Sequence, residues 1–84
     1  MNAPLEIIIH RESYLNWELL VVLLENLGWY EYRITPPGKA STRPNSYVSG
    51  IELFDTAAVR LGKRHLRETA HTFVPFNLDL GGDA

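Results

Sequence analysis

Half of the cationic side chains of this 84-residue chain lie in one short stretch. Four of its eight lysines and arginines lie between positions 60 and 67. They are Arg60, Lys63, Arg64 and Arg67, and their spacing places them on one face of a helix. Such a face suits phosphates, nucleic acid or an acidic protein surface. Lys39 and Arg43 would extend this basic face if their loop lies beside the helix.

The histidines do not form a metal or catalytic pattern. A helical zinc site needs two ligands at i and i+4, whereas His65 and His71 are six positions apart. His10 and Glu12 can share one side of an extended segment, but two groups make neither a metal site nor a tuned acid–base pair. The chain has no nucleophile elbow, no P-loop and no dinucleotide fingerprint. We therefore expect no catalytic residues, no metal and no cofactor.

Composition excludes several other classes. The absence of cysteine excludes disulfides, thiolate nucleophiles and iron–sulfur clusters, and fits a reducing compartment. The N-terminus lacks the basic and apolar regions of a signal peptide, and the longest apolar run, 19–24, is far shorter than the ~20 residues of a membrane span. A net charge of −2 is unusual for a dedicated nucleic-acid binder. We expect a cytoplasmic protein with no membrane contact.

The pattern of apolar residues predicts six elements. Length allows one domain, 1–84, with flexible ends at 1–4 and 81–84. The predicted strands are 5–10, 29–35, 47–54 and 72–80, and the predicted helices are 14–27 and 55–70. Ser13 and Asp55 are candidate N-caps, and Gly28 is a candidate end signal for the first helix. Residues 36–46 are rich in turn-forming types and predict a long loop between the second and third strands.

This order of elements is typical of the ferredoxin-like βαββαβ fold. It predicts an α+β domain with a four-stranded antiparallel sheet of order 4-1-3-2 and two helices on one face. Ile7, Ile8 and Ile9 form an uninterrupted apolar run, which favours a central strand. The alternating segment 29–35 and the proline at position 75 favour edge strands.

Two surfaces are candidates for partner binding. The predicted helix 14–27 is apolar around most of its circumference, so part of it either packs in the core or meets a second copy in a homodimer. Trp29, Tyr30 and Tyr32 form an aromatic cluster of the kind enriched at interface hot spots.

Together these features favour a non-catalytic protein-interaction module, a small inhibitor or regulator that binds a larger protein assembly. Size alone suggests the class of small phage or mobile-element inhibitors of host defence, which includes anti-CRISPR proteins. The alternative is RNA or DNA binding through the basic helix face. An enzyme of the small α+β type is a third reading, for which His10, Arg11 and Glu12 would be the first residues to test.

Overall fold

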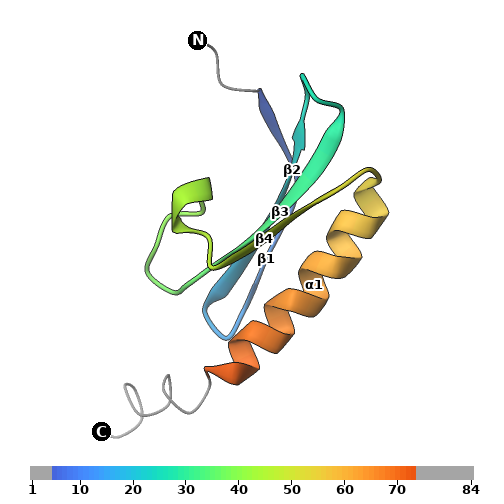
Figure 1. The fold of residues 1–84 in the computed structure, drawn as a ribbon. Helices are drawn as coiled ribbons and strands as arrows, with labels where there is room; N and C mark the ends of the chain where they lie inside the picture. Colours follow the sequence, from blue (N-terminus) through green and yellow to red (C-terminus); the bar gives the residue numbers. More distant parts are fainter. Residues whose placement is uncertain (1–4, 74–84) are drawn as a thin grey trace, which may run out of the picture.

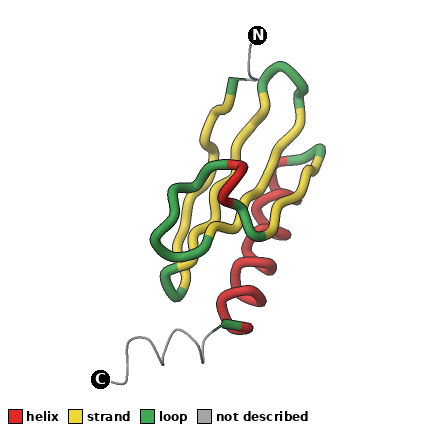
Figure 2. Tube along the Cα trace, turned by 60° about the vertical axis from the view of Figure 1, so that its left-hand side comes forward, coloured by secondary structure: helices red, strands yellow, loops and turns green. Residues whose placement is uncertain are grey.

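The chain folds as a four-stranded sheet with one helix across it (Figure 1). The computed structural model describes residues 5–73. In chain order the elements are β1 (Glu6–Tyr14), β2 (Trp17–Leu24), β3 (Trp29–Thr35), the short 3-10 helix η1 (Arg43–Asn45), β4 (Val48–Glu52) and α1 (Asp55–Thr72). The strands are antiparallel and lie in the order β1-β2-β3-β4, a meander. α1 covers one face of the sheet, and the loop that carries η1 lies on the other (Figures 1 and 2).

The predicted helix 14–27 is wrong, because its first residues form a tight turn. Tyr14 and Trp17 pair across a β-hairpin whose two central residues, Leu15 and Asn16, have φ of 51° and 71°. Two-residue hairpins favour turns with positive φ at both positions, because these match the twist of the strands. Ser13 accordingly lies within β1 and caps no helix.

Leu15 is the costly residue of this turn, because a left-handed conformation brings its Cβ close to the backbone. Changing Leu15→Asn and Asn16→Gly should raise the free energy of unfolding by about 1 kcal/mol. Leu27→Asn is the matched control, since Leu27 is another exposed turn leucine but has no positive φ. Urea titrations of the three proteins would measure the effect. A similar gain from Leu27→Asn would show that polarity rather than turn geometry is responsible.

The apolar run predicted as a helix is a strand buried on both faces. Leu19 and Val21 point to α1, whereas Leu20 and Val22 point to the opposite face, and all four are at most 4% exposed. A strand covered on both sides has no polar face, so its sequence has neither a period of two nor a clear period of 3.6. The core on the α1 side consists of Trp17, Leu19, Val21, Tyr32, Ile34, Ala58, Leu66 and Ala70.

The predicted helix 55–70 is confirmed, and α1 continues to Thr72. Its buried positions are Ala58, Gly62, Leu66, Thr69 and Ala70. Gly62 lets α1 approach the sheet closely, because a Cβ there would lie 2.7 Å from Leu19 Cδ1. The N-cap is Phe54 rather than Asp55, whose carboxylate instead accepts a hydrogen bond from the Thr56 amide at 2.7 Å.

The predicted ferredoxin-like topology is also wrong. The sheet order is 1-2-3-4 rather than 4-1-3-2, and residues 5–73 contain one α-helix rather than two. The predicted strand 29–35 is present as β3, but it is central, and the isoleucine strand β1 is at an edge. The loop 36–46 joins β3 to β4. Strand β4 is shorter than the predicted strand 47–54. In the predicted strand 72–80, Thr72 ends α1 and Phe73 is its C-cap, and positions 74–80 lie outside the described residues, as do both predicted flexible ends.

Candidate functional site

A network of four charged side chains holds the loop 36–46 against the sheet. Arg33 Nη2 donates hydrogen bonds to Glu6 Oε2 at 2.6 Å and to Glu31 Oε1 at 2.8 Å. Arg43, from the loop, donates to both oxygens of Glu31, at 3.0 and 3.2 Å. Glu31 and Arg33 are 5% and 3% exposed. The polar half of the alternating strand is therefore buried by ion pairing, which explains how β3 can be central.

The Glu31 carboxyl makes folding sensitive to acid. Burial would raise its pKa, but the hydrogen bonds and charges of Arg43 and Arg33 outweigh burial, so the pKa lies below its ordinary value of 4.5. A carboxyl with a lowered pKa in the folded protein stabilises it above the unfolded value and loses that contribution as pH falls through the folded value. We therefore expect the melting temperature to fall as pH drops below about 4.5. Arg43→Met should make this fall shallower in a series of thermal melts. An unchanged slope would show that other carboxyls control acid unfolding.

The four helical cations lie where their spacing predicts, on exposed positions of α1. They are not equivalent. Lys63 Nζ lies 3.8 Å from Glu12 Oε1, and the Arg67 guanidinium lies 5.0 Å above the Tyr14 ring. Among residues 5–73, Arg60 and Arg64 make no ion pair.

Lys39 and Arg43, which were predicted to extend the basic face of α1, do not lie beside it. Arg43 is bound to Glu31 on the opposite face of the sheet, and Lys39 belongs to the same loop (Figure 2). The proposed extension of the basic face by these two residues is therefore wrong.

The aromatic cluster is divided between the two faces of the sheet. Tyr32 is 7% exposed and stacks on His65, with ring centroids 5.5 Å apart, and Tyr30 packs on the same core. Trp29 packs against Leu20, Val22 and Leu24 on the other face. Tyr32 is buried, and the half-buried Trp29 and Tyr30 lie on opposite faces, so the three rings do not form one exposed binding surface.

The predicted homodimer contact through a helix 14–27 is also wrong, because the structure has no helix there. The leucines assigned to it, Leu19, Leu20 and Leu24 among them, are core residues of β2. They are unavailable to a second copy.

The three histidines lie apart from one another. His10 Nε2 lies 2.6 Å from Glu12 Oε1, and His71 Nε2 lies 2.7 Å from the Tyr14 hydroxyl. Arg11 projects from the opposite face of β1 and lies 3.6 Å from Glu18, so it does not join His10 and Glu12. Within residues 5–73, no three potential ligands are grouped to hold a metal ion.

One edge of the sheet is apolar and exposed, and it is formed by Leu5, Ile7, Ile8 and Ile9. Their exposed fractions are 59%, 40%, 55% and 39%. They belong to or precede β1, which among the strands of residues 5–73 pairs with β2 alone. A register shift between Ile8 and His10 makes Ile9 the extra residue of a β-bulge. An apolar edge strand with an unpaired backbone is a surface that a further strand can join.

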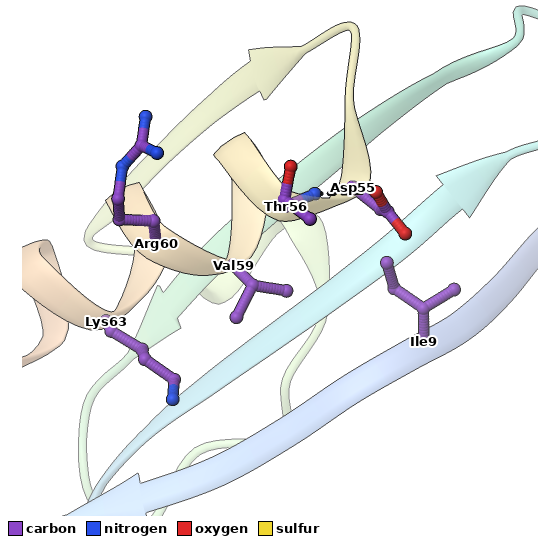
Figure 3. A pocket seen from close by; sticks show the side chains of 6 residues that line it. All are labelled: Ile9, Asp55, Thr56, Val59, Arg60 and Lys63. Atoms are coloured by element: carbon purple, nitrogen blue, oxygen red, sulfur yellow. Dashed lines mark hydrogen bonds between the residues drawn. The ribbon is translucent and has the colours of Figure 1, made fainter.

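A groove lies between this edge and the first half of α1, with a volume of about 490 Å³. Its lining comprises Ile9, Asp55, Thr56, Val59, Arg60 and Lys63. Figure 3 shows Ile9 and Val59 facing each other across the groove, with the Lys63 ammonium directed towards the strands and the Arg60 guanidinium pointing away. We call these six residues the β1–α1 groove. Its apolar part is formed by Ile9 and Val59, and its charged lining residues are Lys63, Arg60 and Asp55.

Sequence reasoning missed the edge and the groove because it placed the isoleucine strand at the centre of the sheet. The available signal was Leu15-Asn16, since asparagine favours the left-handed conformation that a two-residue turn needs. A hairpin at that point makes 6–14 the first strand of a meander, and the first strand of an open meander is an edge.

The fold and this surface define a small α+β domain in which one helix covers a four-stranded meander. Comparisons with protein-family models, with characterised proteins and with solved structures found no match. No helix within residues 5–73 has the length and apolar character needed to cross a membrane.

Proposed function

We propose that this protein is a non-catalytic protein-interaction module, a small inhibitor or regulator that binds a larger protein assembly through the free edge of β1. The observation that carries the proposal is the exposed apolar edge, where Leu5, Ile7, Ile8 and Ile9 are each at least 39% exposed and no strand of residues 5–73 pairs with the outer side of β1. Large exposed apolar side chains gathered along one edge of a small domain are typical of interaction sites.

The sheet itself favours β1 over the opposite edge. β1 has nine residues, whereas β4 has five. Short edge strands are one way in which proteins limit unwanted pairing, and lysine or proline on the edge is another. Neither β1 nor β4 contains lysine or proline, so strand length is the feature that distinguishes the two edges.

A capture experiment tests this function. The tagged protein is incubated with host lysate, and half of the lysate is treated with nuclease. We expect a protein partner that survives nuclease and whose affinity falls about 30-fold or more with Ile9→Lys. Ile51→Lys is the matched control, because Ile51 is an exposed isoleucine of β4. Equal loss with both variants, at unchanged melting temperatures, would remove β1 from the proposal.

The second candidate is nucleic-acid binding by the exposed face of α1. The observation in its favour is that all four cations of this helix are exposed. If all four contact phosphates of duplex DNA, the log–log slope of affinity against salt should be about −3.6. Arg60→Glu with Arg64→Glu should then abolish binding. A flat titration against short RNA and DNA at low salt would end this candidate.

A further inference from the structure

We propose that the ligand of the β1–α1 groove is an extended acidic segment of the protein partner, which adds to β1 as a fifth strand. This inference rests on the proposed function and specifies the chemistry of its partner. Strand addition at a sheet edge obtains affinity from main-chain hydrogen bonds and specificity from pockets for alternate side chains.

The backbone of β1 can supply the main-chain hydrogen bonds. β1 is the first strand of the sheet order, so within residues 5–73 the N–H and C=O groups of its outer side face no neighbouring strand. Its nine residues exceed the usual strand length of about five or six, which leaves room for a complete partner strand.

The groove can supply a pocket for one of the alternate side chains of the added strand. Successive side chains of a strand point to opposite faces, so every second side chain of an added strand would lie on the α1 side of the sheet. There it would meet Ile9 and Val59, which face each other across the groove (Figure 3). A volume of about 490 Å³ lies within the range of clefts that hold ligands. We therefore expect an apolar residue at one of these inward positions.

The charge of α1 indicates the charge of the added segment. α1 carries four cations against two carboxylates, Asp55 and Glu68, although the whole chain has a net charge of −2. Asp55 lines the groove near Ile9 (Figure 3), so an incoming carboxylate would have to lie at the Lys63 end. Lys63 points towards the strands, and its nearest carboxylate, that of Glu12, lies 3.8 Å away and is itself hydrogen-bonded to His10. An incoming carboxylate could therefore join Lys63 without breaking a short ion pair, whereas a basic segment would be repelled by the helix.

The test is selection from a displayed library of random peptides of about eight residues. We expect enrichment of peptides that combine apolar residues at alternate positions with aspartate or glutamate. Lys63→Glu should weaken the selected peptide about tenfold or more, and a peptide with lysine in place of its acidic residues should recover binding to that variant. Arg64→Glu is the matched control, because Arg64 is exposed on α1 and carries the same charge but does not line the groove.

Two further measurements test strand addition. Methylation of alternate peptide amides should abolish binding, and amide hydrogen exchange should slow along β1 but not along β4 when the peptide is added. The inference is overturned if β1 exchange is unchanged, if Arg64→Glu and Lys63→Glu have equal effects, or if no acidic pattern is enriched. It is also overturned if a second copy occupies the edge, seen as a concentration-dependent dimer that Ile9→Lys dissociates.

These outcomes separate the inference from the function on which it rests. Capture of an Ile9-dependent protein partner without an acidic strand-forming peptide would leave the interaction module intact and reject this ligand. Loss of capture in both lysate halves would reject the module itself.

Discussion

Replacing Glu31 with methionine should lower the free energy of unfolding by about 3–5 kcal/mol. Glu31 accepts hydrogen bonds from both Arg33 and Arg43, and Arg33 is 3% exposed. Removing this carboxylate leaves the buried guanidinium with Glu6 as its remaining acceptor, and a partly compensated buried charge is costly. Chemical denaturation followed by tryptophan fluorescence would measure the loss.

Replacing both members of the buried pair should restore most of that loss. Glu31→Met with Arg33→Met removes both buried charges, and apolar residues of similar size commonly substitute for such pairs without net cost. Glu6 and Arg43, whose charged atoms are 3.8 Å apart, can still pair at the surface. We expect the double variant within about 1 kcal/mol of the parent protein.

A matched control separates burial from charge. Arg43→Met also removes one partner of Glu31, but the Arg43 side chain is 51% exposed. Exposed ion pairs contribute under about 1 kcal/mol, so this variant should lose little. If Glu31→Met and Arg43→Met cost the same small amount, the network is an ordinary surface ion-pair cluster.

Leu19→Ala should destabilise the protein by about 2–5 kcal/mol. Leu19 is fully buried on the α1 side of β2, and it contacts the helix where Gly62 lets the two elements meet. Truncation removes apolar contacts and leaves a cavity that the close helix–sheet packing cannot easily collapse. Leu61→Ala is a control that should cost less, because Leu61 lies on α1 and is only partly buried.

A second substitution should repair part of this loss. A Cβ at position 62 would lie 2.7 Å from Leu19 Cδ1 and 3.3 Å from Tyr32 Cβ, so Gly62→Ala alone should be destabilising despite a gain of about 1 kcal/mol in helix propensity. With Leu19→Ala the contact with Leu19 is relieved, although that with Tyr32 Cβ remains, and the new methyl group occupies part of the cavity. We expect the double variant to be about 1–2 kcal/mol more stable than the sum of the single effects predicts. Strict additivity would show that α1 does not rest on Leu19 at this point.

The elements that could be predicted from the sequence are those in which polar and apolar residues alternate with the period of a helix or a strand. α1 buries Gly62 and Leu66 and exposes Arg60 and Arg64, which is the pattern of a surface helix. β3 was equally clear as a strand, because Tyr32 and Ile34 alternate with Glu31 and Arg33. Its central position could not be predicted, since it depends on how the following loop folds back to place Arg43 beside Glu31.

The candidate site was predicted in part. The spacing of the four cations on α1 was sufficient to place them together, because a single helix determines that arrangement. The opposite wall of the groove could not be predicted in the same way. Ile9 meets Val59 only because β1 is an edge strand that lies beside the helix, and this depends on how the sheet is ordered.

The sequence by itself determined the class of the domain, its confirmed helix and the cationic face of that helix, because these follow from residue types at local spacings. Tertiary structure alone decided whether 14–27 became a helix or a turn and a strand. An apolar run covered on both sides satisfies either structure, so the choice depends on what packs against it. That choice placed the isoleucines of β1 at an open edge, where the proposed partner binds.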